Sequence, residues 1–186
     1  FLSEIPLFMR SGRFGIDTAI IQVSPPDAHG FCSLGISVDI ARAACEVATR
    51  IIALVNPNMP RSLGDSFIHQ SRITAAVFAN DTILECAAGP TSSIEVAIGK
   101  NVAQLVEDGA TLQMGIGGIP NAVLQYLSGH KNLGIHTEMF SDGVIPLIQN
   151  GTINNSRKKI VKGYCVTSFM LGTKALYDFA DDNPII

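Results

Sequence analysis

Apolar and polar positions in the first half of the chain alternate between runs typical of buried strands and runs with helical spacing. A β-branched run is broken by a segment rich in Pro, Asp and Gly, and apolar residues then recur every three or four positions before a second β-branched run. This order predicts a β-α-β unit. We expect a strand over residues 17–23, a helix over 38–48, a strand over 50–55, a short strand over 66–69, and either a strand or a buried helix over 73–79.

The second half opens with a helix start signal. Ser92 and Glu95 have the spacing of a capping box, in which each side chain bonds the backbone of the other. Gly109 is expected to end the helix. The apolar residues before it form one stripe, made of Ile94, Ile98, Val102, Leu105 and Val106. Further along we expect strands over 111–114, 133–137 and 159–167, and helices over 120–127, from a cap at Asp142 to Gln149, and over 173–180.

The alternation of strands and helices predicts an α/β fold with a mostly parallel sheet covered on both faces. A boundary is expected near residues 80–90, where the apolar periodicity lapses and Ala87 to Thr91 fits a linker. The first residue is not Met, and the last ones, Asp181 to Ile186, run from a helix end into an apolar pair typical of a strand start. We therefore expect a fragment of a longer protein.

Composition narrows the possible functions. Of the 186 residues, 47% are hydrophobic and 16% charged, which is typical of a globular protein. The net charge of −3 and the absence of a strongly basic block argue against binding to nucleic acid or an anionic membrane. Apolar runs are too short to span a bilayer, and no signal-peptide pattern opens the sequence, so a cytoplasmic protein is expected. The four cysteines lack metal-site spacing and are expected to be reduced, mostly buried thiols; no metal is predicted.

The glycine cluster Gly115-Ile116-Gly117-Gly118 and the acid Glu138 are the candidate functional residues. The cluster fits a strand-to-helix turn with accessible backbone N–H groups, and Glu138 follows a predicted strand. A G-x-G turn with an acid about twenty residues later also fits a nicotinamide- or flavin-binding site, although the third glycine of that motif is missing. The plainer alternatives are a tight structural turn and a solvated acid paired with a lysine such as Lys131.

Three segments resemble the acetyl-CoA hydrolase/transferase family. QMGIGGIPN at 113–121 and GIHTEMFSDG at 134–143 are most similar to the 4-hydroxybutyrate and butyrate CoA-transferases, and VSPPDAHGFCSLG at 23–35 is similar to part of the family's first domain. The resemblance covers nearly the whole chain, although family members are longer at both ends. It implies two open, mostly parallel sheet domains of the CoA-transferase type, with residues 1–88 as the latter part of the first domain and 89–186 as the earlier part of the second.

The resemblance also implies the chemistry. The glutamate that matches Glu138 attacks an acyl-CoA thioester and passes through a mixed anhydride to a glutamyl-CoA thioester, in a ping-pong transfer of CoA to a carboxylic acid such as acetate. A carboxylate is ionised at neutral pH and needs no partner base. We expect CoA as a co-substrate, no tightly bound cofactor, and a homo-oligomer. The expected CoA contacts are Gln113, Met114, Gly115, Ile116, Gly117, Gly118 and Ile119.

Other functions and roles stay open at this point. An acyl-CoA hydrolase would use the same Glu138 with water as the acceptor, and an inactive CoA-binding or assembly fragment would turn nothing over. On a strand His136 lies on the same face as Glu138 and could donate a hydrogen bond to it, but a packed histidine is the commoner case. His29, in a loop, could reach a ligand or be merely exposed.

Overall fold

The computed structural model describes residues 1–186, which divide into two compact units. Unit 1 consists of residues 1–84 and 180–183, and unit 2 of residues 85–179 and 184–186. Both contain parallel strands joined through helices, so the α/β class with open, mostly parallel sheets is confirmed.

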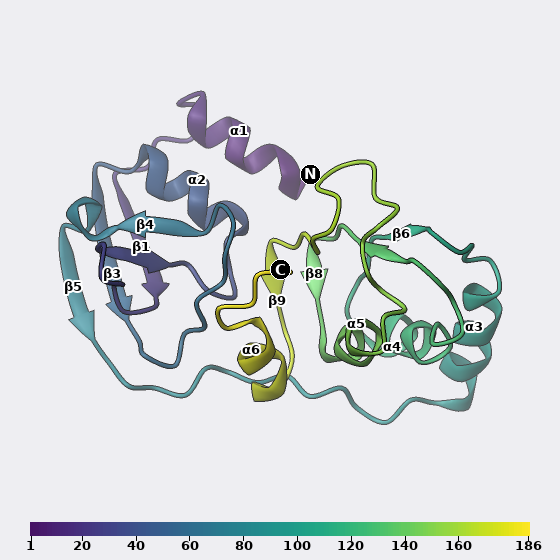
Figure 1. Ribbon diagram of the computed structural model, residues 1–186. Helices are drawn as coiled ribbons and strands as arrows, with labels where there is room; N and C mark the ends of the chain where they lie inside the picture. Colours follow the sequence, from purple (N-terminus) through teal and green to yellow (C-terminus); the bar gives the residue numbers. More distant parts are fainter. The chain divides into compact units, whose positions relative to one another are not determined.

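Unit 1 is built on a three-stranded parallel sheet with the strand order β1-β3-β5 (Figure 1). The predicted β-α-β arrangement is confirmed, and the ambiguous run 73–79 contains a strand. Strands β2 and β4 form a separate, short antiparallel pair. The elements are η1 (Leu2–Glu4), α1 (Ile5–Arg10), β1 (Thr18–Val23), β2 (Phe31–Ser33), α2 (Asp39–Val47), β3 (Arg50–Val55), β4 (Phe67–His69), η2 (Gln70–Arg72) and β5 (Ala75–Phe78).

The two faces of the β1-β3-β5 sheet differ in burial. Ile21 and Ala53 belong to the core cluster that includes Cys45 of α2. On the opposite face Ile20 is 80% exposed and Val77 is 58% exposed. The expectation that both faces are covered is therefore wrong for unit 1, because the residues of this unit supply helical cover for only one of them.

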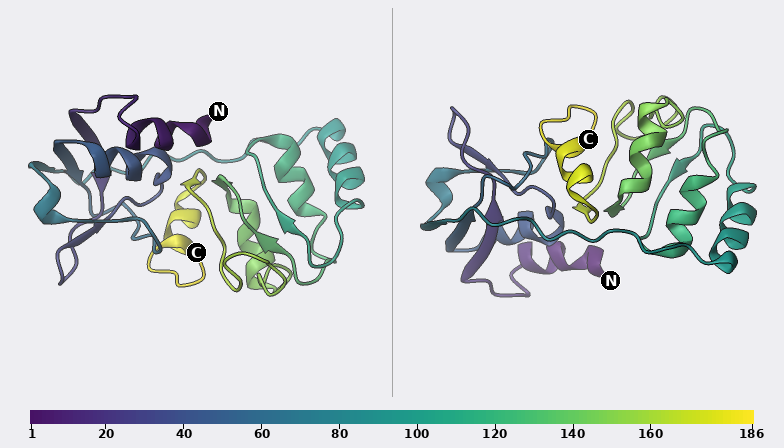
Figure 2. Two further views of the ribbon diagram at one scale, coloured as in Figure 1. Left: turned by 90° about the horizontal axis from the view of Figure 1, so that it is seen from above. Right: turned by 90° about the horizontal axis from the view of Figure 1, so that it is seen from below.

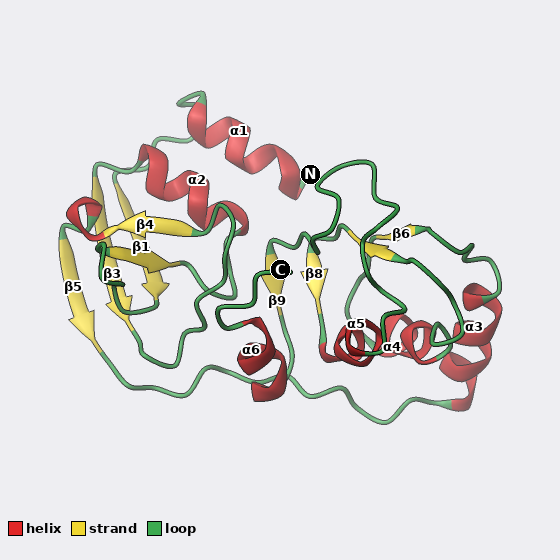
Figure 3. Ribbon diagram, viewed as in Figure 1, coloured by secondary structure: helices red, strands yellow, loops and turns green.

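Unit 2 has short, mostly parallel strand pairings instead of one long ladder. β6 pairs with β7 and β8 with β9, and parallel bridges join Leu133 to Ile153 and His136 to Val166. Figure 3 shows how much of the chain between these strands is loop. The elements are α3 (Ser93–Ala103), β6 (Thr111–Leu112), α4 (Gly118–Gln125), β7 (Gly134–Ile135), β8 (Met139–Phe140), η3 (Asp142–Val144), α5 (Ile145–Gln149), β9 (Phe169–Met170) and α6 (Lys174–Ala180).

Helices α3 and α4 pack closely against each other, as both views in Figure 2 show. A Cβ on Gly99 would lie 2.8 Å from the Cβ of Ala122, so glycine is needed for this approach. The predicted Ser92–Glu95 capping box is confirmed. The helix ends at Ala103, however, so it is shorter than expected, and most of its predicted apolar stripe is exposed; the buried residues of α3 are small ones, Gly99 and Ala103.

The predicted strand over residues 159–167 is wrong. Most of this segment forms turns, and its only strand-like contact is the bridge at Val166. Val161 and Gly163 have positive φ angles of 50° and 91°, which no regular strand contains. Two of the segment's apolar residues, Ile160 and Val161, are exposed.

Candidate active site

The chain segment that carries Glu138 is fixed on both sides by hydrogen bonds. On one side the His136 N–H donates to the Leu112 carbonyl at 3.0 Å. On the other, the Thr137 N–H donates to the Val166 carbonyl at 2.9 Å, and the Glu138 carbonyl accepts from the Phe169 N–H at 2.9 Å. The backbone around Glu138 therefore has little freedom, although Glu138 itself lies between β7 and β8 and belongs to neither strand.

The Glu138 side chain is exposed and makes no hydrogen bond or ion pair within the protein. Lys131, the lysine that the sequence offers as a partner, forms no ion pair with it. Burial alternates from Ile135 to Glu138, so the side chains of His136 and Glu138 lie on the exposed side of the segment and Thr137 on the buried side. The Glu138 carboxylate is thus exposed to solvent on a backbone that hydrogen bonds fix.

Thr137 connects this segment to the glycine turn. Its hydroxyl accepts a hydrogen bond from the Met114 N–H at 2.8 Å and donates one to the Met114 carbonyl at 2.9 Å. Met114 immediately precedes Gly115, and Thr137 immediately precedes Glu138. The glycine turn and Glu138 are far apart in the sequence, but the hydrogen bonds between Met114 and Thr137 join the residues that immediately precede them.

The glycine turn offers unpaired backbone donors. Gly115, Ile116 and Gly117 are exposed, and their N–H groups donate no hydrogen bond within the protein. Gly117 is the N-cap residue of α4 and has a φ of 115°, which a residue with a Cβ rarely adopts. Gln113 and Ile119 are also exposed, whereas the Met114 side chain is buried.

Gly118, at the first turn of α4, is already contacted by an acidic side chain. A Cβ at this position would collide with the Glu95 carboxylate, which also accepts hydrogen bonds from the N–H and the hydroxyl of Ser92. The Ser92 backbone and side-chain donors hold the pKa of Glu95 below its ordinary value. A negative charge therefore lies at the N-terminus of α4, and it disfavours a second anion there. The sequence does not reveal this contact, because the local pattern around Glu95 indicates only a cap.

Gly118→Ala is expected to lower the free energy of unfolding by about 1–3 kcal/mol, because the new methyl group must displace the Glu95 carboxylate. Urea unfolding measures the loss. Gly129→Ala, where a Cβ meets nothing within 4 Å, is the control and should have little effect. In Glu95→Ala/Gly118→Ala the loss should be smaller than the sum of the single losses. Strict additivity would contradict the proposed collision.

A cavity of about 850 Å³ in unit 2 reaches the glycine turn. Ile116, Gly117 and Gly118 belong to its lining, together with the segment 86–90, whereas Glu138 does not. The cavity therefore offers room beside the turn for a part of a ligand that does not react, and the carboxylate lies outside it.

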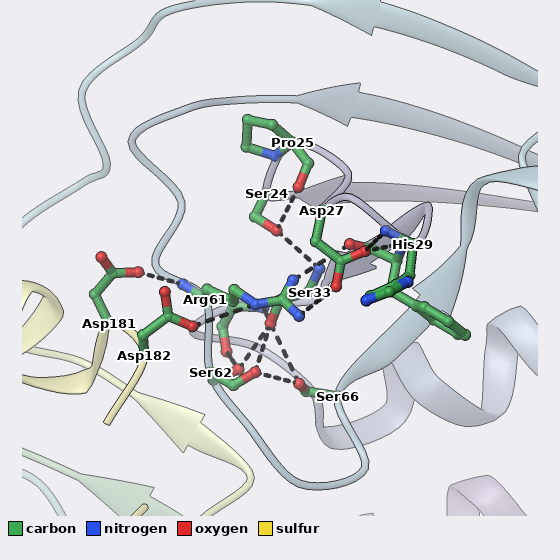
Figure 4. Close-up of polar contacts among 12 residues, drawn as sticks. Ser24, Pro25, Asp27, His29, Ser33, Arg61, Ser62, Ser66, Asp181 and Asp182 are labelled. Atoms are coloured by element: carbon green, nitrogen blue, oxygen red, sulfur yellow. Dashed lines mark hydrogen bonds and ion pairs between the residues drawn. The ribbon is translucent and has the colours of Figure 1, made fainter. Parts of the chain in front are cut away.

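The segment 23–35 of unit 1 folds as a tightly bonded turn (Figure 4). The Asp27 carboxylate accepts from the N–H groups of His29 and Phe31 at 2.9 Å and from Arg61 Nη2 at 2.7 Å. The Phe31 N–H is the largest cause that lowers the pKa of Asp27, and the His29 N–H and Arg61 add to it. Arg61 also stacks over the Phe67 ring.

A buried serine cluster supports the same segment (Figure 4). The Ser33 hydroxyl donates to the Ser62 carbonyl at 2.9 Å, and the Ser33 N–H donates to the Ser24 hydroxyl at 2.8 Å. Ser66 lies within 3.2 Å of the same Ser33 hydroxyl. These buried polar groups satisfy one another's hydrogen-bonding capacity, so the serine side chains stabilise the local structure of this segment. His29 is exposed, and it joins these contacts through its backbone.

Asp142 does not cap the following helix as predicted. Its carboxylate accepts from the N–H and hydroxyl of Thr173, which joins the end of β8 to the end of β9. Ser141 is the N-cap residue of η3 but makes no side-chain capping bond. The cap prediction fails because the sequence cannot reveal a partner 31 residues away.

No group of three or more His, Cys, Asp or Glu side chains gathers in a geometry that could hold a metal ion. All four cysteines are free, and three of them are buried as expected. None of the helices has the length and apolar character needed to cross a bilayer.

Comparisons with known proteins agree with this architecture. The chain is 51% identical over 186 residues to the 4-hydroxybutyrate coenzyme A transferase of Clostridium kluyveri, and 52% identical over 187 residues to the succinyl-CoA:acetate/propanoyl-CoA:succinate CoA transferase of Fasciola hepatica. These alignments cover all of this chain but 43% and 39% of the relatives, so the chain spans less than half of their length. The crystal structure of the 4-hydroxybutyrate CoA-transferase from Porphyromonas gingivalis superposes with a TM-score of 0.95 at 47% identity, over 100% of this chain and 47% of that one.

The fold is therefore an α/β fold of the CoA-transferase type. The profile of the acetyl-CoA hydrolase/transferase N-terminal domain matches residues 1–88. The chain belongs to the acetyl-CoA hydrolase/transferase family, as the resemblance of its three segments predicts.

Proposed function

We propose that the protein is an acyl-CoA:carboxylate CoA-transferase in which Glu138 is the nucleophile. The observation that carries the proposal is the exposed, unpartnered Glu138 carboxylate on a backbone that Thr137 ties to the start of the glycine turn. Relatives named as CoA transferases at 51% and 52% identity support the same reaction class.

In the proposed reaction a Glu138 oxygen attacks the thioester carbonyl of the acyl-CoA. The C–S bond breaks, which leaves a mixed anhydride on Glu138 and a CoA thiolate. The thiolate then attacks the glutamyl carbonyl of the anhydride, and the acyl group leaves as a carboxylate. An incoming carboxylic acid reverses these steps on the resulting glutamyl-CoA thioester, and Glu138 is regenerated as a carboxylate.

The glycine turn is proposed to hold the CoA part of the substrate. Free N–H groups at Gly115, Ile116 and Gly117 can bond CoA or the oxyanion of a tetrahedral intermediate, and one well-placed donor contributes about 3–4 kcal/mol to such an intermediate. Gln113, Met114, Gly118 and Ile119 complete the proposed contact segment. Gly118 is the least suited to an anion, because the Glu95 carboxylate lies beside it.

The proposed substrates are short acyl-CoA thioesters, among them 4-hydroxybutyryl-CoA and butyryl-CoA, with acetate as an acceptor. The names of the two relatives support short acids of this kind. CoA is then a co-substrate and no tightly bound cofactor takes part. We propose further that residues 1–88 and 89–186 belong to the first and second CoA-transferase domains of a cytoplasmic homo-oligomer.

The purified full-length protein, incubated with butyryl-CoA, tests transfer against hydrolysis. Acetyl-CoA should form only when acetate is present, and at the rate at which butyryl-CoA is lost, because the glutamyl-CoA thioester reacts further only with a carboxylate acceptor. Chromatography of the CoA species measures both products. Release of free CoA at a rate independent of acetate would defeat the transferase proposal and favour the hydrolase. No turnover with any short acyl-CoA would favour a binding or assembly role.

A further inference from the structure

The backbone of Ile135, three residues before Glu138, is held by two side chains where the neighbouring strand pairing is interrupted. Parallel bridges join Leu133 to Ile153 and His136 to Val166, but residues 154–165 between them form turns and loops, so no regular strand continues alongside Ile135. The Ile135 N–H donates to Asn155 Oδ1 at 2.9 Å. The Ile135 carbonyl accepts from Lys158 Nζ at 2.7 Å and, more weakly, from the Val166 N–H at 3.2 Å. We call these two side chains the Asn155–Lys158 latch.

Lys158 occupies an unusual environment for a lysine. It is 4% exposed and forms no ion pair; its ammonium group donates only to the Ile135 carbonyl and, at 2.6 Å, to the Tyr164 carbonyl. Burial lowers its pKa. A buried lysine without a carboxylate partner is rare and costly, so its presence here indicates a specific role.

The surroundings are shaped to hold this lysine. A Cβ on Gly134 would lie 2.6 Å from Lys158 Cγ, so the side chain passes directly over a glycine of β7. Asn155 is 3% exposed and has a φ of 58°, a conformation that asparagine tolerates better than most residues. Its amide also donates to Cys165 Sγ at 3.3 Å. Both members of the latch therefore sit in fitted, buried positions.

The latch is continuous with the hydrogen bonds that fix the candidate nucleophile. From Ile135 onward, His136 bonds Leu112 and Thr137 bonds both Met114 and Val166. A shift at Ile135 would thus move the whole segment that ends in Glu138.

We propose that the Asn155–Lys158 latch positions Glu138 for attack on the thioester, and that Asn155 and Lys158 are positioning residues of the CoA-transferase site. This inference rests on the proposed function. In this proposal Asn155 and Lys158 affect activity without contacting the substrate, because they fix the backbone of the segment that carries Glu138.

The test compares Lys158→Met with Lys159→Met in the full-length protein; Lys159 is adjacent and exposed, so it controls for loss of charge. Lys158→Met should lower kcat for CoA exchange by about 10- to 100-fold and change KM for the acyl-CoA by less than about threefold, because a misplaced nucleophile slows the reaction more than binding. Lys159→Met should match the wild type. Asn155→Gly tolerates the positive φ and removes only the side chain, so it should reproduce the effect if Lys158→Met folds poorly.

Amide hydrogen exchange supplies a readout independent of activity. In the latch variants the peptide covering residues 134–139 should exchange at least about tenfold faster, whereas α4 should be unaffected. Unchanged kcat in both variants, or faster exchange spread evenly over unit 2, would overturn the proposal, because the residues would then contribute only general stability. If the wild type itself transfers no CoA, the proposed function fails. Amide hydrogen exchange at residues 134–139 in the variants then still decides whether the latch holds this segment.

Discussion

Glu138→Gln is expected to lower the rate of CoA exchange by a factor of about 10³ or more, because the amide keeps the shape of the side chain but cannot act as the nucleophile. The temperature midpoint of unfolding should not change, since the carboxylate is exposed and unpartnered. Exchange of labelled acetate into acyl-CoA, followed with the purified full-length protein, measures the loss.

Glu107→Gln provides the matched control, because Glu107 is an exposed glutamate of the same unit outside the candidate site. It should retain wild-type exchange. Glu138→Asp keeps the charge but draws the carboxylate back by one methylene, so an activity between those of wild type and Glu138→Gln is expected. Near-normal exchange in Glu138→Gln would remove Glu138 from the chemistry and leave the glycine turn as a binding element only.

Phe140→Ala is expected to lower the free energy of unfolding by about 3–5 kcal/mol. Phe140 is fully buried and lies in β8, where it pairs with Met170 of β9. Removing the ring leaves a cavity beside the segment that carries Glu138, and the surrounding core can collapse only in part. Urea unfolding followed by circular dichroism measures the change.

Tyr164→Ala is the control for Phe140→Ala, since Tyr164 is 52% exposed whereas Phe140 is fully buried. Its effect should stay within about 0.5 kcal/mol. A loss below about 1 kcal/mol for Phe140→Ala would contradict the full burial of the Phe140 side chain.

Local signals in the sequence predict much of the fold. The Ser92–Glu95 spacing predicts the start of α3, and the β-branched run 50–55 predicts β3, because each signal depends on residues that are neighbours along the chain. The alternation of such elements is enough to predict the α/β class. Lengths are less well predicted: α3 ends at Ala103, before the apolar residues that extend the prediction.

The failures involve partners that are distant in sequence. The apolar residues of 159–167 fit a strand, but Lys158 turns inward to bond Ile135 and the chain around Val161 leaves extended geometry. Asp142 fits a helix cap, yet its carboxylate bonds Thr173. Each of these residues satisfies its local pattern, and a tertiary contact overrides it.

The sequence predicts the individual residues of the candidate site but not the contacts that bring them together. Residue type, spacing and family resemblance single out Gly115 to Gly118 and Glu138. The Thr137–Met114 bonds that join them, and the Glu95 carboxylate beside Gly118, exist only in the folded chain. The capping box predicts an acidic group at the start of α3, but nothing in the sequence places that group beside α4.

Glu138 is proposed to carry CoA as a covalent thioester, and this intermediate can be trapped. Borohydride added after the full-length protein has reacted with an acyl-CoA reduces such a thioester to an alcohol, and mass spectrometry of the digest locates it. We expect an alcohol at Glu138 that depends on acyl-CoA and is absent from protein treated with borohydride alone. A modification on another carboxylate, or none while exchange proceeds at its normal rate, would contradict the assignment of Glu138 as the nucleophile.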